Sequence, residues 1–324
     1  DIMDAMDYFL RMNAGDPDRP FGGMQMIFMG DLFQLPPVVR QDSMYFLKRR
    51  NYTSPYFFAA HGLAEVNLIH LELTKIYRQE DRGFLSLLEM VRRNELDYDS
   101  VTELNEQFEE GFEGYEGESW LTLCATNKVA NAINLKKLEA LDTPQFNFIG
   151  KSEGRFQGMA LPVPDLLSLK EKTQVLFTRN DPRGRWVNGT IGTIVELESN
   201  KIKVEITDPT DGKLREVEVK PEKWEMYKYS FNEVENSIVA DEIGAYEQYP
   251  LKLAWAITIH KSQGMTFDRL ILDMGAGAFA PGQLYVALSR CRSLEGIKLK
   301  RKITPRDVIV DPQIIEYAAQ NDIL

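Results

Sequence analysis

The segment Trp255-Ala256-Ile257-Thr258-Ile259-His260-Lys261-Ser262-Gln263-Gly264-Met265-Thr266 decides the fold class. It begins in a mostly apolar, β-branched stretch over residues 253–259, which predicts a buried strand. It continues with a cation, hydroxyl groups and a glycine, and such groups donate hydrogen bonds to phosphate oxygens. Ligands of open α/β folds bind beyond the carboxyl ends of the strands, so the segment favours an α/β protein that binds phosphate. Taken alone, however, it is better explained as a polar turn before the next strand.

The length and composition are those of an ordinary globular protein. The chain has 324 residues, enough for two domains and a small third one, and 44% of them are hydrophobic. We expect no membrane span and no secretory signal. The two cysteines, Cys124 and Cys291, cannot build a disulfide framework, which fits a cytoplasmic location. Three scattered histidines predict no metal site.

The negative charge of the chain is concentrated in one stretch. The formal net charge is -11 at pH 7, a value that argues against a nucleic-acid partner. Residues 79–118 contain 13 Asp and Glu against 3 Arg, whereas residues 251–324 contain 10 Lys and Arg against 7 Asp and Glu. Because the local field decides where phosphate binds, the charge neither establishes nor excludes DNA binding.

A second apolar segment also ends in a glycine and polar residues. Residues 24–29 predict a short strand, and Gly30-Asp31-Leu32-Phe33-Gln34-Leu35-Pro36-Pro37-Val38 follows, with two prolines that keep the exit loop extended. The Gln34 amide is placed to donate to a phosphate or to orient a water molecule. The alternative is that Gln34 only hydrogen-bonds its own loop.

Two arginines stand at positions suited to binding an anion. Residues 71–79 predict a strand that reaches Arg78. It is followed by a helix over residues 84–93, whose predicted buried face consists of Phe84, Leu87, Leu88 and Val91. Residues 282–292 predict another helix, where Arg290 flanks the apolar face, so that its stem packs while its guanidinium reaches a cleft. A lone arginine is usually a solvated surface charge, so neither residue defines a site by itself.

The remaining segments complete an α/β pattern with an inserted β region. Strands are predicted at 120–125, 269–274 and 296–301, and helices at 1–10, 128–141 and 313–319. Asn127 is the expected N-cap of the middle helix. Residues 173–249 differ, because several short strands separated by turns are typical of a small antiparallel barrel or sandwich.

The β region contains a cluster of basic and aromatic residues. Arg179, Arg183, Arg185 and Trp186 could neutralise and stack on a nucleic-acid strand. An exposed hairpin tip, with no binding role, is the better-supported interpretation of the same residues.

Four segments acquire a specific meaning when they are taken together and in order. They are Gly30-Asp31-Leu32-Phe33-Gln34-Leu35-Pro36-Pro37-Val38, Tyr77-Arg78-Gln79, Thr258-Ile259-His260-Lys261-Ser262-Gln263-Gly264 and Tyr285-Val286-Ala287-Leu288-Ser289-Arg290. This set resembles the motifs of the superfamily 1 branch that contains the petite-integration-frequency (PIF) DNA helicases and the RecD-like helicases. The PIF type is the closer match, because Pro20-Phe21-Gly22-Gly23 also precedes the first segment in that family. The resemblance spans nearly the whole chain.

The resemblance implies an ATP-driven motor that translocates 5′ to 3′ on single-stranded DNA and unwinds duplexes. By position, Gln34 is similar to the γ-phosphate sensor of the first motor domain. Arg78 and Arg290 are similar to two arginines that the second motor domain projects toward the nucleotide, a role suited to a planar cation that keeps its proton. We therefore expect these three residues to be catalytic and to face one nucleotide site.

The resemblance also assigns wider sets of binding residues. The expected nucleotide-binding residues are Gly30, Asp31, Gln34, Arg78, Gly264 and Arg290. The expected DNA-binding residues are Thr258, His260, Lys261, Ser262, Gln263 and Thr266. The expected partners are single-stranded DNA and duplex junctions, with no membrane, for a monomer active in DNA repair and recombination.

The same resemblance implies a division of the chain into four parts. Residues 1–72 would be the C-terminal remnant of a first RecA-like motor domain. Residues 73–172 and 251–324 would form a second RecA-like motor domain around a parallel sheet. Residues 173–250 would be an inserted SH3-like β-barrel, located near the path by which DNA leaves the motor.

Two motifs of the family are missing from the sequence. Helicases of this branch carry a P-loop and an Asp-Glu magnesium motif before the segment that contains Gln34. Gly150-Lys151-Ser152 is not a P-loop, because Gln145 stands where the first glycine is required. We therefore expect the C-terminal part of a helicase that uses ATP and Mg²⁺, with negligible ATP hydrolysis by this chain alone and no metal ligands in it.

Two other functions remain open at the level of sequence. One is a single-stranded DNA-binding module without enzymatic activity. The other is an inactive RecD-like subunit of a recombination nuclease, although no cluster of carboxylates suggests nuclease chemistry.

Overall fold

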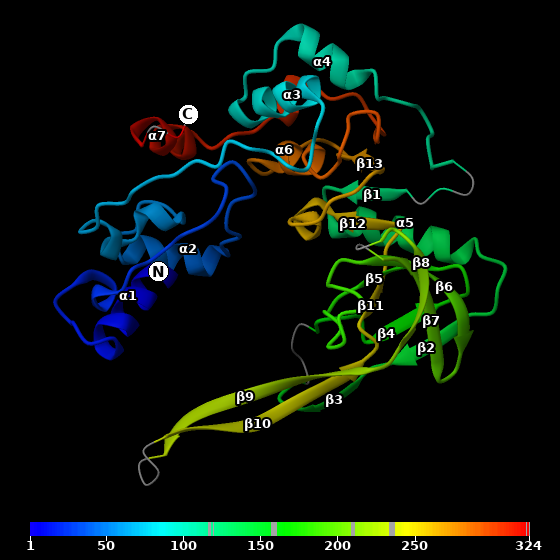
Figure 1. The fold of residues 1–324 in the computed structure, drawn as a ribbon, viewed down its shortest axis with the longest axis horizontal. Helices are drawn as coiled ribbons and strands as arrows, with labels where there is room; N and C mark the ends of the chain where they lie inside the picture. Colours follow the sequence, from blue (N-terminus) through cyan, green and yellow to red (C-terminus); the bar gives the residue numbers. More distant parts are fainter. Residues whose placement is uncertain are drawn as a thin grey trace. The chain divides into compact units, whose positions relative to one another are not determined.

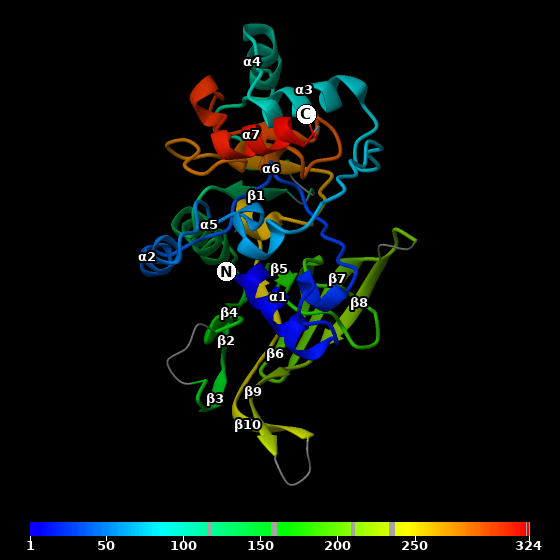
Figure 2. The same cartoon turned by 90° about the vertical axis from the view of Figure 1, so that its left-hand side faces the viewer.

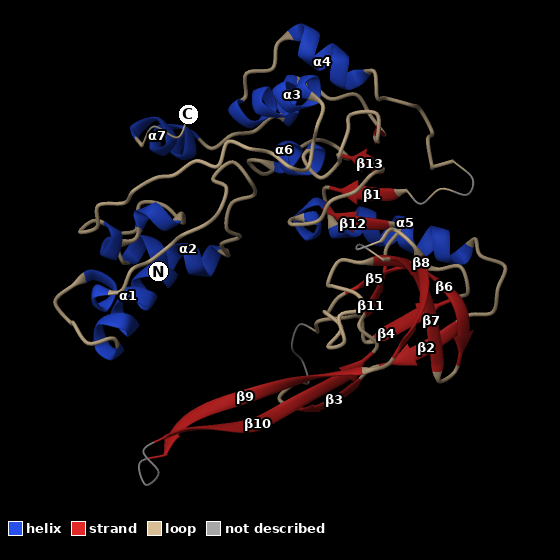
Figure 3. Cartoon of the chain, in the orientation of Figure 1, coloured by secondary structure: helices blue, strands red, loops and turns tan. Residues whose placement is uncertain are grey.

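The computed structural model describes residues 1–115, 118, 120–156, 161–208, 211–232, 237–321 and 323. The chain divides into two compact units. Unit 1 comprises Asp1–Glu110, Thr266–Asp268 and Ala276–Leu324, and unit 2 comprises Gly111–Met265 and Arg269–Gly275. Most helices belong to unit 1 and most strands to unit 2 (Figure 3). Among the described residues, no helix combines the length and the apolar character needed to cross a lipid bilayer.

Unit 1 is built mainly from short helices (Figure 1). Its elements are α1 (Ile2–Asn13), η1 (Pro20–Gly23), α2 (Gln41–Arg49), η2 (Phe57–Ala59), η3 (His61–Leu63), α3 (Arg82–Arg93), α4 (Tyr98–Asn105), α6 (Gln283–Leu288), β14 (Ile297–Leu299), η5 (Pro305–Asp307) and α7 (Pro312–Gln320). The predictions of α1, α3, β14 and α7 are confirmed.

Helix α3 shows why periodicity was informative in unit 1. The Asp81 side chain accepts a hydrogen bond from the Phe84 backbone N–H and so caps the first turn. The helix buries the four residues that the 3.6-residue period selected, which are Phe84, Leu87, Leu88 and Val91. Asn94 then ends it in the left-handed conformation.

The predicted strands at residues 24–29 and 71–79 are wrong. Both segments are irregular, and no described strand pairs with either of them. Many of their apolar side chains are exposed, including Ile27 at 75%, Met29 at 93% and Leu73 at 92%. An apolar segment forms a strand only when a neighbouring strand satisfies its backbone groups, and apolar content alone cannot reveal whether that neighbour exists.

Unit 2 contains the parallel sheet that the sequence predicted. Strand β1 (Leu121–Cys124) lies between β12 (Ala256–Thr258) and β13 (Leu270–Asp273) and is parallel to both. Helix α5 (Asn127–Glu139) packs beside β12, where the Asn134 side chain bonds both backbone groups of Ala256 at 2.8 Å. This arrangement confirms the α/β class. The N-cap of α5 is Thr126, one residue before the predicted Asn127.

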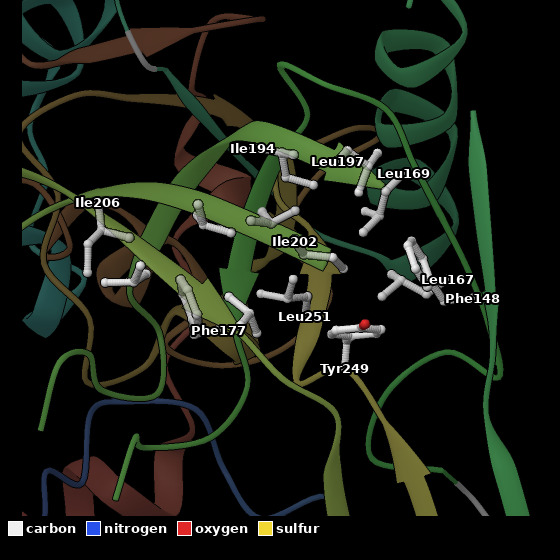
Figure 4. Packing of buried hydrophobic residues seen from close by; sticks show 14 of the residues in the cluster. Phe148, Leu167, Leu169, Phe177, Ile194, Leu197, Ile202, Ile206, Tyr249 and Leu251 are labelled. Atoms are coloured by element: carbon white, nitrogen blue, oxygen red, sulfur yellow. The ribbon is translucent and has the colours of Figure 1, made fainter. Parts of the chain in front are cut away.

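The inserted β region contains a five-stranded antiparallel sheet in the order β11-β5-β6-β7-β8. Its strands are β5 (Gln174–Phe177), β6 (Ile191–Glu198), β7 (Lys201–Thr207), β8 (Leu214–Val219) and β11 (Leu251–Leu253). Figure 4 shows Ile194 and Ile202 directed into the same interior as Phe177 and Leu251. The described strands do not close into the expected barrel, because their pairing ends at β8 and β11.

A long ribbon accompanies this sheet within unit 2. Strands β9 (Glu222–Asn232) and β10 (Ser237–Gln248) pair antiparallel, and β3 (Lys151–Gly154) pairs with the other edge of β10. The ribbon extends well beyond β6 and β7 in both views (Figures 1 and 2). A separate pair, β2 (Phe146–Ile149) with β4 (Leu166–Leu169), adds Phe148 to the core through its contact with Tyr249, 4.9 Å between ring centres.

Two details of the β region differ from the sequence predictions. The predicted strand at residues 253–259 is divided between two sheets, because β11 ends at Leu253 and β12 begins at Ala256. Trp186 is 4% exposed and lies in the core of the insertion, so it is not placed to stack on nucleic acid. Arg185 lies over its ring and forms an ion pair with Asp181.

Candidate functional site

Arg78 is bound to the segment that follows helix α6. Its Nη1 donates to the Ser289 carbonyl at 2.9 Å, and its Nε donates to the Thr266 hydroxyl at 3.0 Å. All of these residues belong to unit 1. Partial burial, followed by the charge of Arg292, lowers the pKa of Arg78, while Tyr285 acts in the opposite direction. Arg78 is therefore a half-buried cation that is fixed at two points.

Arg290 occupies the same region but is more deeply buried. It is 2% exposed, and its Nε donates to the Val286 carbonyl at 3.1 Å while Nη2 donates to the Ser289 hydroxyl at 3.0 Å. The prediction that its guanidinium reaches a cleft is therefore wrong for this conformation. The reason is that α6 ends at Leu288, so that Arg290 lies beyond the last helical turn and folds back onto it.

The two arginines influence one another electrostatically. Burial and then the positive charge of Arg78 lower the pKa of Arg290 to about 10, although Tyr285 and Asp31 act in the opposite direction. Arg290 remains protonated at neutral pH, because even this pKa lies well above 7. Two neighbouring cations in a partly dry environment favour binding of a group with several negative charges.

Gln34 is held by the carboxylate of Asp31. The Gln34 Nε2 donates to Asp31 Oδ2 at 3.1 Å, and the Phe33 backbone N–H donates to Oδ1 at 3.0 Å. The Tyr285 hydroxyl also donates to Asp31 Oδ2, at 3.3 Å. Burial and the charge of Asp31 raise the pKa of Tyr285 to about 12, so the phenol stays protonated and remains a donor. Asp31 thus connects Gln34 with helix α6.

The loop that carries Gln34 is anchored against the C-terminal helices of unit 1. Phe33 is 4% exposed and packs with Ile314 and Ala318 of α7. The guanidinium of Arg92 lies over the Phe33 ring at 4.4 Å. A Cβ at Gly282, the residue before α6, would lie 2.4 Å from the Phe33 carbonyl oxygen. These contacts hold the loop and α6 together.

The structure therefore places Gln34, Arg78 and Arg290 in one connected neighbourhood of unit 1. Sequence reasoning did not identify Tyr285, Gln79 or Ser289 as members of it. Tyr285 could have been found from the helical period, because it lies one residue after Leu284 and so at the margin of the buried face of α6. The contacts of Gln79 and Ser289 depend on long-range packing and carry no local signal.

The predicted DNA-binding segment forms a tight turn after β12. Residues Ile259–Ser262 form the 3₁₀ helix η4, in which the Thr258 hydroxyl accepts from the Lys261 backbone N–H. The Ser262 hydroxyl donates to the Ile259 carbonyl at 2.7 Å. Thr258 and Ser262 are buried, at 5% and 0% exposure, so these two predicted contact residues shape the turn from inside.

The exposed side of this turn is polar and basic. Lys261 and Gln263 are exposed, and Lys261 Nζ donates to the Asn127 side chain at 3.3 Å. Burial lowers the pKa of His260 and, together with the charge of Lys261, that of Lys252. Gly264 has a φ of 81° and no atom within 4 Å of an added Cβ, so the backbone is accessible there. A strand with negative charges fits this surface.

The remaining predicted residues differ in their surroundings. Gly30 is exposed, with no atom within 4 Å of an added Cβ. Thr266 is exposed and is bound to Arg78 in unit 1, whereas the other predicted DNA-contact residues belong to unit 2. Among the described residues, no group of three or more His, Cys, Asp and Glu side chains is arranged to hold a metal ion.

The chain is similar to curated ATP-dependent DNA helicases. The chain is 34% identical over 319 residues to the ATP-dependent DNA helicase Pif1 of Bdellovibrio bacteriovorus, which covers 96% of this chain and 65% of the relative. It is 31% identical over 325 residues to the ATP-dependent DNA helicase PIF1 of Homo sapiens, covering 98% of this chain and 47% of the relative. The chain thus spans between about half and two thirds of the length of these curated relatives.

Solved structures agree with this relationship. The crystal structure of Bacteroides Pif1 bound to single-stranded DNA matches with a TM-score of 0.78 and 34% identity, covering 100% of this chain and 72% of that one. The structure of Bacteroides Pif1 in complex with ADP-AlF3 and single-stranded DNA matches equally well. No protein-family model matches the chain. The 34% identity to Bacteroides Pif1, over 72% of that protein's chain, establishes the relationship. The chain belongs to the Pif1 family of DNA helicases.

Proposed function

We propose that this chain carries the arginine half of the nucleotide site and a DNA-strand contact of an ATP-dependent 5′-to-3′ DNA helicase. The observation that supports it most is that Arg78 and Arg290 both contact Ser289 in unit 1: Arg78 Nη1 donates to its carbonyl at 2.9 Å, and Arg290 Nη2 donates to its hydroxyl at 3.0 Å. Gln34 belongs to the same network through Asp31 and Tyr285. The curated relatives are ATP-dependent DNA helicases by name.

The proposed chemistry follows from the charges of these side chains. ATP with Mg²⁺ supplies the phosphoanhydride whose hydrolysis drives movement on DNA. Arg78 and Arg290 stabilise the negative charge that develops on the transferred phosphoryl group, and Gln34 orients the attacking water. Gly30 and Asp31 would add nucleotide contacts in unit 1, and the resemblance also assigns Gly264, in unit 2, to nucleotide binding. Magnesium ligation is not assigned to it, because the described carboxylates form no suitable cluster.

The DNA contact is proposed at the turn after β12. Lys261, His260 and Gln263 would bind the phosphates of a single strand directly, with Thr266 following them in sequence, while Thr258 and Ser262 fix the turn. We further propose that residues 1–72 belong to a first RecA-like motor domain and that 73–172 and 251–324 form the second. Residues 173–250 would then be the SH3-like insertion, which contains β5, β6, β7 and β8 of the five-stranded sheet, while β11 follows it directly.

The first experiment compares ATP hydrolysis by this 324-residue chain with that of a form extended upstream to include a P-loop, both with single-stranded DNA. We expect turnover only by the extended form, because the 324 residues contain no P-loop to bind the β- and γ-phosphates. ATP turnover by the short chain at the rate of the extended form would contradict the proposal.

The second experiment tests the DNA contact through Lys261→Ala. Loss of one cation at the strand should weaken binding of a single-stranded oligonucleotide and reduce the slope of log affinity against log salt by about 0.7. Lys136→Ala is the matched control. Lys136 is an exposed lysine on helix α5 of unit 2, and it forms an ion pair with Glu113. Equal affinity and slope for Lys261→Ala and the control would rule out this role for Lys261.

A further inference from the structure

Gln79 connects the backbone segments that carry the two arginines. It is 4% exposed, and its Nε2 donates to the carbonyls of Ser289, at 3.0 Å, and Cys291, at 2.7 Å. These two carbonyls precede and follow Arg290 in sequence, and Gln79 itself follows Arg78. We propose that Gln79 is a positioning residue, which fixes the spacing of Arg78 and Arg290. The inference rests on the proposed function of these arginines.

Gln79 adds to the contacts that fix this arrangement. Arg78 already donates to the Ser289 carbonyl, and the backbone N–H groups of residues 289–291 donate to carbonyls of α6. The two guanidinium groups nevertheless carry the same charge, and their mutual repulsion favours separation of the two segments. The buried hydrogen bonds from Gln79 oppose that separation.

Other contacts support the same segment without replacing Gln79. Phe267 forms an isolated bridge with Cys291, in which the Phe267 N–H donates to the Arg290 carbonyl at 2.9 Å and the Arg292 N–H donates to the Phe267 carbonyl at 3.1 Å. This bridge fixes residues 290–292 to residues 266–268. The bonds from Gln79 connect the segment to the residue next to Arg78, in addition to the bond that Arg78 makes to the Ser289 carbonyl.

The chemistry of glutamine suits this position. Its amide nitrogen carries two N–H groups, so one side chain can donate to both carbonyls. Methionine has a similar length but no donor, and a lysine would add a third positive charge beside the arginines. Gln79→Met therefore removes the two hydrogen bonds and leaves the volume nearly unchanged.

The kinetic test uses Gln79→Met in the form extended upstream to include a P-loop, with saturating single-stranded DNA. We expect kcat to fall by about 10- to 100-fold, because small misplacements of catalytic groups have effects of this size. The KM for ATP should change by less than about threefold, since Gln79 acts on groups that matter in the transition state. A kcat within threefold of wild type would overturn the inference.

Gln248 provides a matched control for loss of a buried amide. It is 3% exposed, and its Nε2 donates to the carbonyls of Phe148 and Asp165, both at 3.0 Å, within unit 2. Gln248→Met should lower the unfolding temperature as Gln79→Met does, but it should leave kcat within about threefold. An equal loss of kcat in both variants would reduce Gln79 to a general stability role and contradict the inference.

Two further measurements separate positioning from the proposed catalytic function. In the 324-residue chain, Gln79→Met should accelerate hydrogen exchange at the amides of residues 290–292, which needs no ATP turnover; unchanged exchange there overturns the inference even if the helicase assignment stands. In the extended form, Gln79→Met should reduce kcat much less in an Arg290→Lys background than in wild type, because both changes act on the same group. Fully additive effects would contradict action through Arg290.

Discussion

Asp31 connects the loop that carries Gln34 with helix α6 through hydrogen bonds. Its Oδ2 accepts from both Gln34 and Tyr285, while Oδ1 accepts from the Phe33 backbone. Asp31 fixes the Gln34 amide and is itself contacted by Tyr285, 254 residues further along the sequence. This arrangement would preorganise the Gln34 amide for its proposed role.

The Tyr285→Phe variant tests this connection. It removes only the hydroxyl that donates to Asp31, so we expect kcat of the extended, P-loop-containing form to fall by about 3- to 10-fold without a change in DNA affinity. Tyr317→Phe is the control, because its hydroxyl also has a single side-chain partner in unit 1, His70, at 2.9 Å. If both variants retain wild-type kcat, Tyr285 does not support Gln34.

The sequence identified Gln34, Arg78 and Arg290 as candidates because their types and their neighbouring motifs are local features. It could not predict that Arg290 folds back, since that orientation depends on the Val286 carbonyl and on where α6 ends. Neither could it predict the bonds of Gln79, whose acceptors lie more than 200 residues away. Residue identity was therefore predictable, and side-chain geometry was not.

At the scale of elements, helix α6 is the part that arranges the site. Its start is fixed by Gly282, with a φ of 71°, and its buried residues include Leu284, Ala287 and Leu288, as the periodicity predicted. Helix α3, with which α6 is in contact, carries Arg92 above Phe33. The apolar period predicted α3 because that helix buries one face, whereas α6 is short and five of its six residues are buried. Strands were harder to predict, because residues 24–29 and 71–79 have apolar content without a partner strand.

Gly282→Ala should disturb this arrangement strongly. The new Cβ would lie 2.4 Å from the Phe33 carbonyl oxygen and 2.7 Å from that of Gln34, and the positive φ adds backbone strain. We expect a loss of about 2–4 kcal/mol in the free energy of unfolding, measured by chemical denaturation.

Gly184→Ala separates the effect of the steric clash from the effect of backbone strain. Gly184 has a nearly identical φ of 72°, but no atom lies within 4 Å of its added Cβ. Its cost should be limited to backbone strain, about 1 kcal/mol. A Gly282→Ala variant no less stable than Gly184→Ala would show that α6 and the Gln34 loop are not in close contact.

At the scale of the whole molecule, several carboxylates of the acidic stretch over residues 79–118 are paired with nearby cations. In unit 1, Glu89 pairs with Arg92 and Arg93, and Glu109 pairs with Lys298. In unit 2, Glu113 pairs with Lys136 and Lys137. Such exposed pairs contribute little stability, but they reduce the field of the acidic stretch over residues 79–118. The net charge of -11 is therefore compatible with a strand-binding surface around Lys261.

The α/β class followed from the sequence because β1 and β13 are short apolar runs and a helix, α5, follows β1. The ribbon of β9 and β10 did not, since much of its length is exposed and its packed residues, such as Trp224 and Tyr246, lie at the end near β3. The order of the five-stranded sheet likewise depends on pairings such as β11 with β5, which join segments about 75 residues apart. Local sequence patterns do not determine which distant strands pair in this fold.

The central claim is that Arg78 and Arg290 act as one unit on the nucleotide phosphates. The most direct measurement is steady-state ATP hydrolysis by Arg78→Ala, Arg290→Ala and the double variant of the extended, P-loop-containing form, together with their affinity for single-stranded DNA. We predict that each single variant loses more than about 100-fold in kcat while DNA binding is retained, and that the double variant is hardly worse than either one. Turnover within about tenfold of wild type in the Arg290→Ala variant would contradict the account.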